Sequence, residues 1–164
     1  MRAYRIENFG TIEGIVADYE PEPEPGPGQV VVRLHARSVN RRDLLILHRK
    51  YPVAAHQRVV PVSDGVGTVQ AVGDGVRAVE VGDHVTAAYF PNWRDGRFRL
   101  EYAAEQFGCT RDGMLADCVL AGESALVKIP PHLSFEEAAT LPCAALTAWT
   151  ALTGPRRVLP GKPC

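Results

Sequence analysis

The chain has 164 residues, of which 46% are hydrophobic and 23% charged, and its formal net charge is -1. These proportions are those of an ordinary globular protein that is long enough to bury a core. The 18 basic residues are balanced by 19 acidic ones, so we expect no nucleic-acid partner. No stretch approaches the roughly 20 apolar residues of a membrane span, and the first residues lack a signal-peptide pattern. We therefore expect a cytoplasmic protein with no membrane partner.

The first third of the chain alternates between apolar and polar residues as strands do. Residues 12–17 and 29–37 are predicted strands, separated by the proline-rich, acidic loop 20–28. A short helix is predicted over residues 40–50, because Asn40 can cap its first turn and an apolar run follows.

Residues 59–89 have the pattern of tightly turned antiparallel strands. We predict strands over 65–72, 76–81 and 84–88, and strands resume over 114–120 and 125–129 after an irregular segment with one helical stretch near 101–107. The predicted fold is mainly β with helices, as a small, partly open barrel.

The C-terminal part is predicted to be helical. Ser134 and Glu137 form a capping-box pattern for a helix through Ala139, and Pro142 separates it from a more apolar helix over 143–152. Residues 158–164 are similar to the turn before a buried strand. We divide the chain into a domain over 1–130 and a helical junction over 131–164.

Five short motifs occur in a fixed order: ARSVNRRDLLILHRKYP from residue 36, PVSDGVG from 61, VGDGV from 72, VGDHV from 81 and EEAATLPC from 136. Together they resemble the medium-chain dehydrogenase/reductase superfamily, and within it the zinc-independent, quinone-reductase-like members known as zinc-type alcohol dehydrogenase-like. The resemblance implies a GroES-like barrel followed by a Rossmann domain that binds a dinucleotide. The glycine-rich turn of that second domain does not occur in the chain, so we expect the Rossmann domain to be lacking here.

The resemblance also indicates chemistry without a metal. Zinc-dependent members use Cys, His and Cys ligands, and the matching positions here are Asn40, Ser63 and Cys143, so no zinc is expected. The implied reaction is hydride transfer from NADPH or NADH to a small-molecule acceptor such as a quinone or an enone. The full-length protein would be a homodimer or homotetramer, and the present chain alone would be inactive.

Two residues are candidates for catalysis. Asn40 could donate a hydrogen bond to a carbonyl oxygen or hold the nicotinamide ribose, although capping the helix is an alternative role for the same side chain. Asp64 could line the substrate cleft, and a turn role before Gly65 is the alternative. Asp43 is predicted to cap the helix or bond locally.

Three residues are candidates for cofactor binding. By resemblance, Arg41 would contact the pyrophosphate, Tyr51 would close over cofactor or substrate, and Thr147 would touch the nicotinamide side. A solvated side chain is the alternative for Arg41, and simple packing is the alternative for Tyr51 and Thr147. Arg42 replaces a proton-relaying hydroxyl residue, which argues against alcohol oxidation.

Two other functions stay open. One is a GroES-like binding or assembly module that acts alone. The other is a zinc alcohol dehydrogenase with unusual ligands.

Overall fold

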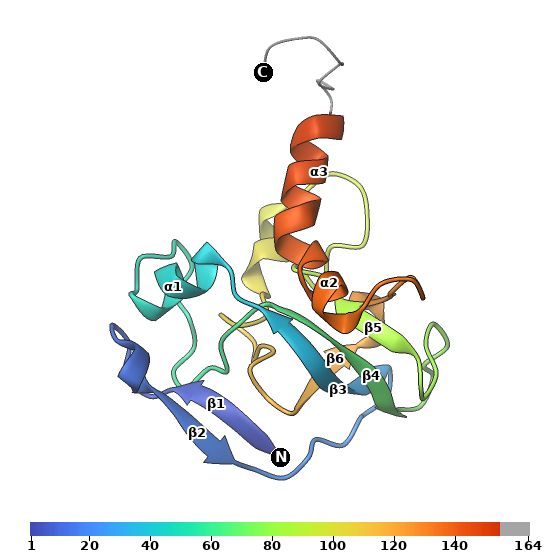
Figure 1. Ribbon diagram of the computed structural model, residues 1–164, viewed down its shortest axis with the longest axis horizontal. Coiled ribbons are helices and arrows are strands. Elements are labelled where there is room, and N and C mark those ends of the chain that lie inside the picture. Colours follow the sequence, from blue (N-terminus) through green and yellow to red (C-terminus); the bar gives the residue numbers. More distant parts are fainter. Residues whose placement is uncertain (155–164) are drawn as a thin grey trace.

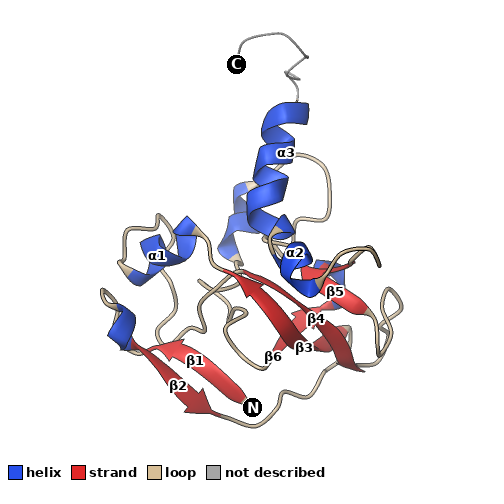
Figure 2. Ribbon diagram, in the orientation of Figure 1, coloured by secondary structure: helices blue, strands red, loops and turns tan. Residues whose placement is uncertain are grey.

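In β3 (Gln29–Ser38), the three valines Val30, Val31 and Val32 are buried, whereas Arg33 and His35 are exposed. The strand pairs antiparallel with β4 (Asp64–Val72) on one side and with β6 (Cys118–Gly122) on the other. Two more strands, β5 (His84–Ala87) and β7 (Leu126–Lys128), extend the sheet in the order β6-β3-β4-β5-β7. A separate two-stranded sheet contains β1 (Arg2–Ile6) and β2 (Ile15–Tyr19). The computed structural model describes residues 1–154, shown in Figure 1 and Figure 2.

The five-stranded sheet is curled into a half-open barrel. The pairing of β3 with β4 shifts register between Val31 and Val32 and again between Leu34 and Ala36, and such bulges bend a sheet. In β4, a Cβ added to Gly67 would lie 2.0 Å from a carbonyl oxygen of β3, so the close approach of the two strands requires glycine. The curled sheet encloses a core that includes Val30, Val32, Val69, Val85, Phe107 and Met114. The predicted barrel is confirmed.

Helices lie at two places on this barrel. The first, α1 (Arg41–Leu47), packs Ile46 and Leu47 into a second small core beside β1. At the C-terminal side, α2 (Phe135–Ala139) buries two alanines against β3 and β4. A π-helical turn, Leu141–Ala145, then leads into α3 (Leu146–Thr153), which rises away from the sheet in Figure 1. Short 3₁₀ turns span Ile12–Gly14, Leu100–Ala104 and Glu123–Ala125.

The predicted signals at the C-terminal helices are present. The hydroxyl of Ser134 accepts a bond from the Glu137 N–H at 3.1 Å, and the Glu137 carboxylate accepts one from the Ser134 N–H at 2.9 Å. Pro142 interrupts the α-helical pattern because it has no N–H to donate. The chain stays helical by widening into the π-turn, where the Ala145 N–H donates to the Thr140 carbonyl at 3.3 Å.

The strand predicted over residues 76–81 is wrong. This segment is irregular and lies between two turns, and the backbone N–H groups of Arg77 and Ala78 donate to the Glu123 carboxylate at 2.8 and 3.0 Å. Val79 is nevertheless buried in the core. Val79 therefore packs into the core without pairing with a neighbouring strand, whereas Val81 is 61% exposed.

Other predicted boundaries also shift. The strand predicted from residue 114 begins only at Cys118, because the N–H groups of Met114 and Leu115 donate to carbonyls of the 61–62 loop at 2.7 and 3.1 Å. The strand predicted from residue 12 begins at Ile15, after a 3₁₀ turn, and β1 was not predicted at all. The helical stretch expected near 101–107 is a 3₁₀ turn that ends at Ala104.

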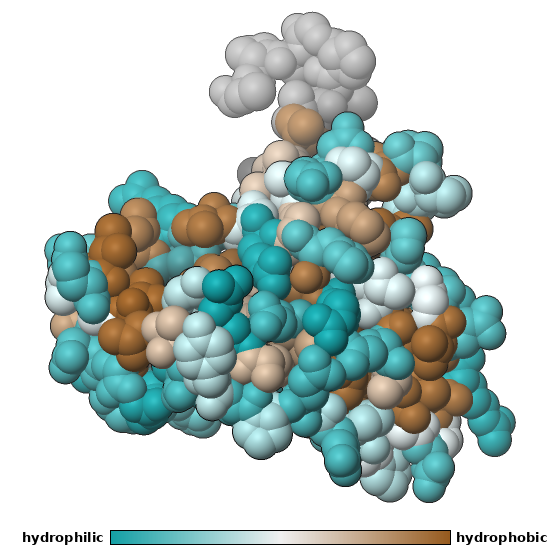
Figure 3. Space-filling model, turned by 60° about the horizontal axis from the view of Figure 1, so that its bottom comes forward, coloured by the Kyte–Doolittle hydropathy of each residue, from teal (hydrophilic) through white to brown (hydrophobic). Residues whose placement is uncertain are grey.

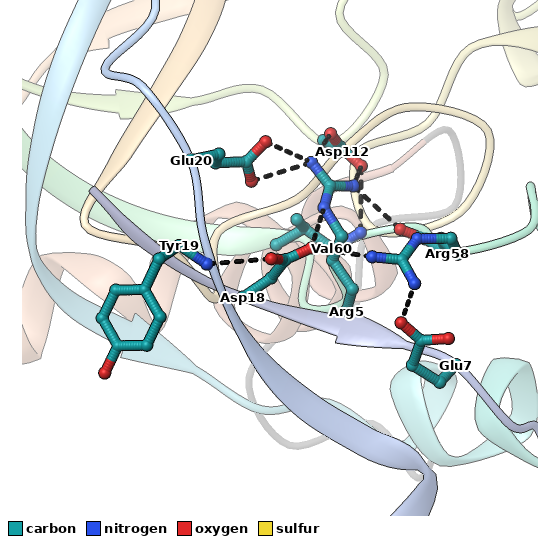
Figure 4. A network of polar contacts seen from close by, with 8 residues as sticks. All are labelled: Arg5, Glu7, Asp18, Tyr19, Glu20, Arg58, Val60 and Asp112. Atoms are coloured by element: carbon teal, nitrogen blue, oxygen red, sulfur yellow. Dashed lines mark hydrogen bonds and ion pairs between the residues drawn. The ribbon is translucent and has the colours of Figure 1, made fainter.

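Charged side chains tie the two-stranded sheet to the loops beside it, as Figure 4 shows. Arg5 of β1 lies between the carboxylates of Glu20 and Asp112, with nitrogen–oxygen distances of 2.9 and 3.1 Å. The Asp112 carboxylate also accepts the backbone N–H of Val60 at 2.9 Å. A second arginine on the same face, Arg58, contacts Asp18 and Glu7.

The residues from 155 onward, including the segment predicted to resemble a turn before a strand, lie outside the described part of the chain. The division at residue 130 stays a prediction. Among residues 1–154, no helix has the length and apolar character needed to cross a membrane.

Candidate functional site

A cleft of about 820 Å³ lies between α3 and the sheet. Leu146 and Thr147 line it from the α3 side, and Tyr89, Phe90 and Trp93, which follow β5, line the opposite side. This volume is typical of sites that bind small molecules. On the face drawn in Figure 3, exposed hydrophobic surface forms separate brown patches among teal hydrophilic side chains.

A second cavity, of about 400 Å³, borders Arg5, Glu20 and Asp112. The charge of Arg5 is already balanced by the two carboxylates, so this cavity is a poor receptor for an anion. The larger, apolar cleft is the better candidate site.

Arg42 is the centre of a buried polar network behind Tyr89. Its charged side chain is only 7% exposed. Nη1 donates to the Phe107 carbonyl oxygen at 2.9 Å, and Nη2 donates to Oε1 of Gln106 at 3.2 Å. The guanidinium carbon lies 5.2 Å from the ring centre of Tyr51 and 4.8 Å from that of Tyr89. Two aromatic faces and two amide oxygens thus compensate for the lost hydration of the cation.

The side chain of Gln106 joins this network to the two tyrosines. Its Oε1 accepts a hydrogen bond from the Tyr51 hydroxyl at 3.0 Å, and the Tyr51 hydroxyl lies 2.9 Å from that of Tyr89. Its Nε2 donates to the Ala103 carbonyl at 2.7 Å. Tyr89 therefore lines the cleft while buried side chains fix it from behind.

Asp64 is the centre of a second buried network, which lies behind Cys143. One of its oxygens accepts the Ser63 hydroxyl at 2.6 Å, and the other accepts Asn40 Nδ2 at 3.0 Å and the backbone N–H of Cys143 at 3.1 Å. Asp64 is 0% exposed and Ser63 is 1% exposed. This single carboxylate connects the start of β4, the start of α1 and the π-turn.

Burial governs the ionisation of the groups around the cleft. It raises the pKa of Tyr89, and the hydrogen bond with Tyr51 raises it further, against the opposing charge of Arg42. Burial also raises the pKa of the Cys143 thiol, and the nearby Asp64 charge acts in the same direction. Both side chains are therefore neutral at pH 7. Asp43 likewise has a raised pKa, chiefly because it is buried, although the Asn40 backbone N–H and Arg42 lower it.

The structure brings the two predicted catalytic residues together. Asn40 is the N-cap residue of α1, and Asp43 accepts its backbone N–H at 2.8 Å, so Asp43 has the predicted local capping role. The Asn40 side chain points to Asp64 and lies 3.5 Å from the Ser38 carbonyl. Donation from Asn40 to a substrate carbonyl would require one of these bonds to break. Asp64 itself is buried and does not line the cleft.

The three predicted cofactor-binding residues are in different places. Thr147 lines the cleft, and its hydroxyl donates to the Cys143 carbonyl at 2.6 Å. The hydroxyl of Tyr51 points inward to Gln106. Arg41 is exposed at the start of α1 and makes no side-chain hydrogen bond or ion pair with residues 1–154. Their roles in binding a cofactor stay predictions.

Sequence reasoning missed the positions that organise the cleft. Arg42 was considered only as a departure from the family pattern, and neither Gln106 nor Tyr89 was selected. A charged residue inside the apolar-facing part of a short helix was the available signal for Arg42. For Gln106, in an irregular loop, the sequence holds no comparable signal.

The polar groups around the cleft do not form a metal-binding set. Within residues 1–154, no group of three or more His, Cys, Asp or Glu side chains is placed to hold a metal ion. Cys143 is the single soft ligand at this position, and both oxygens of Asp64 already accept hydrogen bonds.

Comparison with known proteins gives a consistent assignment. Residues 26–131 match the alcohol dehydrogenase GroES-like domain. A zinc-type alcohol dehydrogenase-like protein of Schizosaccharomyces pombe is 43% identical over 146 residues, which cover 88% of this chain and 42% of that protein. The chain thus spans less than half the length of this relative.

Two solved structures have the same fold. An NAD-dependent alcohol dehydrogenase superimposes with a TM-score of 0.78 at 35% identity, over 93% of this chain and 46% of that one. A quinone oxidoreductase of Pseudomonas syringae superimposes with a TM-score of 0.76 at 30% identity, over 98% of this chain and 43% of that one. The chain therefore belongs to the medium-chain dehydrogenase/reductase superfamily, of which it carries the N-terminal GroES-like domain.

Proposed function

We propose that this chain is the substrate-binding part of an oxidoreductase that transfers hydride from NADPH or NADH to a quinone, an enone or a similar carbonyl acceptor, without zinc. The observation that carries the proposal is the apolar cleft, which is backed by a hydrogen-bonded Asp64 cluster at the positions where the family resemblance implies zinc ligands. A reduced nicotinamide supplies the hydride chemistry, and the protein supplies position and environment.

The side chains at the site support a proposed reaction without zinc. Structural and catalytic zinc sites take at least three Cys, His or carboxylate ligands. Here Asn40 and Ser63 direct their protons to Asp64, so they stabilise the carboxylate in place of a cation. The cluster joins α1, β4 and the π-turn through hydrogen bonds, as a bound metal would through ligand bonds.

The apolar lining supports an apolar acceptor. Phe90, Trp93 and Leu146 all line the cleft, and the polar network of Arg42 is separated from it by Tyr89. A cleft with a largely apolar lining of this kind favours planar or aliphatic molecules with few polar groups. Thr147 is the predicted cofactor residue that lies on the cleft wall, so it is the best placed of the three to contact a bound nicotinamide.

The test requires a protein in which this chain is joined to a nucleotide-binding domain, because the relatives are more than twice as long as the matched region. Oxidation of NADPH or NADH would be followed by its absorbance with 1,4-naphthoquinone or an enone as acceptor, and reduction of NADP+ or NAD+ would be followed in the same way with a simple alcohol as donor. We expect turnover of the quinone or enone that is unchanged by a strong chelator. Loss of turnover on chelation, restored by added zinc, would instead support a zinc alcohol dehydrogenase with unusual ligands.

A further inference from the structure

We propose that the cleft binds apolar molecules that donate a hydrogen bond, such as alcohols or hydroquinones, more tightly than matched molecules that only accept one. This inference rests on the proposed function in so far as it takes the cleft as the substrate site. It adds that the cleft is preorganised for the hydroxyl member of a carbonyl–hydroxyl couple.

The side-chain amide of Gln106 has one fixed orientation. Its Nε2 donates to the Ala103 carbonyl at 2.7 Å, and its Oε1 accepts from Arg42 Nη2 at 3.2 Å. A flipped amide would place N–H against N–H at Arg42 and oxygen against oxygen at Ala103. Two independent contacts therefore fix Oε1, which is only an acceptor, on the side of Tyr51.

The hydroxyls of Tyr51 and Tyr89 donate their protons in one fixed direction. Tyr51 has one hydroxyl proton, and Gln106 Oε1 can only accept it, at 3.0 Å. In the 2.9 Å contact between the two hydroxyls, Tyr51 must then accept and Tyr89 must donate. The Tyr89 hydroxyl thus donates its proton to Tyr51, on the side of the protein interior, and can only accept a hydrogen bond from a ligand.

Three other polar side chains of the cleft also donate their protons to carbonyl oxygens of the protein. The hydroxyl of Thr147 donates to the Cys143 carbonyl at 2.6 Å, and that of Thr86 donates to a β4 carbonyl at 2.9 Å. Nε1 of Trp93 donates to a carbonyl of its own loop at 3.0 Å. All these residues line the cleft, so its walls offer hydroxyl lone pairs and apolar surface.

Three lining side chains are exceptions. Thr150 and the neutral thiol of Cys143 donate no side-chain hydrogen bond within residues 1–154, and Lys128 is 53% exposed and contacts Asp83 at 2.7 Å. A carbonyl ligand could use these donors, of which the thiol is a weak one. A hydroxyl ligand could use the hydroxyl oxygens of Tyr89, Thr86 and Thr147 as acceptors, and the preference follows from the additional net hydrogen bond.

The test compares 1-tetralol with 1-tetralone and 1-methoxytetralin, which share one bicyclic skeleton. Calorimetric titration of the 164-residue chain should give a dissociation constant for 1-tetralol that is about fivefold lower than for the other two, as one net hydrogen bond implies. Tyr89→Phe and Thr147→Val should each reduce this ratio. The control Tyr102→Phe, which changes a tyrosine outside the cleft, should keep it.

Equal or tighter binding of 1-tetralone by the unsubstituted chain would overturn the inference, as would a preference that persists in the folded Tyr89→Phe, Thr147→Val double variant. If Tyr89→Phe fails to fold, Thr147→Val on the exposed face of α3 decides alone. No binding of any of the three probes would refute the cleft as a ligand site. The titration uses no nicotinamide, so a failed hydride-transfer assay and a failed binding preference are separate results.

Discussion

Replacing Asp64 with alanine should separate the helical junction from the barrel. The carboxylate is fully buried and accepts three hydrogen bonds, from Ser63, Asn40 and the Cys143 N–H. Hydrogen bonds to charged groups contribute roughly 1.5–3 kcal/mol each, and such contributions are not additive within one cluster. We therefore expect Asp64→Ala to lower the free energy of unfolding by about 4 kcal/mol, which is a large part of the stability of a typical domain.

Urea unfolding followed by circular dichroism measures this loss. Asp95→Ala, at an exposed turn, is the matched control and should change the free energy of unfolding by less than about 0.5 kcal/mol. Asp64→Asn keeps one acceptor oxygen and should fall between the two. A loss in Asp64→Ala no larger than that of the control would refute the reasoning, because the carboxylate would then not connect α1, β4 and the π-turn.

Three further predictions concern the same buried groups. The Arg42 guanidinium lies 3.6 Å from the Asp43 carboxylate, so Arg42→Met leaves that carboxylate and the Gln106 and Phe107 oxygens without their cation. Urea unfolding should show a loss of about 3 kcal/mol, whereas Arg41→Met, at an exposed position, should show almost none. Equal losses in the two variants would contradict the network. The pKa of Asp43 is raised by burial above its ordinary 3.8, so its contribution to stability is fully present below that pH and is lost as the pH rises through the folded-state pKa. Asp43→Asn should remove this loss from the pH profile of unfolding, and an unchanged profile would show that Asp43 is not responsible. Finally, the double variant Asn40→Cys, Ser63→His should combine with Cys143 to form a set of three ligands that binds Co²⁺. Its absorption spectrum should then show a thiolate-to-cobalt charge-transfer band, which the unsubstituted chain should lack. A band of equal strength from the unsubstituted chain would refute the proposed absence of a metal site.

The barrel could be predicted because its signals are local and repeated. The valine alternation of β3, the glycine-containing turns and the Ser134–Glu137 capping box each act within a few residues. The failure at residues 76–81 has a physical cause, since the side chain of Glu123, far along the chain, satisfies the backbone there. An alternating pattern of apolar residues therefore does not establish that a segment pairs with a neighbouring strand.

The site was predictable only in part for the same reason. The family resemblance selected Asn40 and Asp64 as separate candidates, but it did not predict that their side chains are in contact. The Arg42 network joins a helix to Gln106 and Tyr89 from two irregular loops, and no periodic pattern links these residues in the sequence. The direction of the Tyr51 and Tyr89 hydroxyl protons depends on the fixed amide of Gln106, so it emerges only from the three-dimensional contacts.

The proposed function is direct hydride transfer to a carbonyl acceptor without zinc. Its most direct test uses chelator-treated protein, with this chain joined to a nucleotide-binding domain, and NADPH deuterated at the transferable position. We predict that an enone product carries deuterium on its β-carbon, as mass spectrometry would show, in a preparation without stoichiometric zinc. Product formed only by the zinc-loaded protein, or product without deuterium at that carbon, would contradict the account.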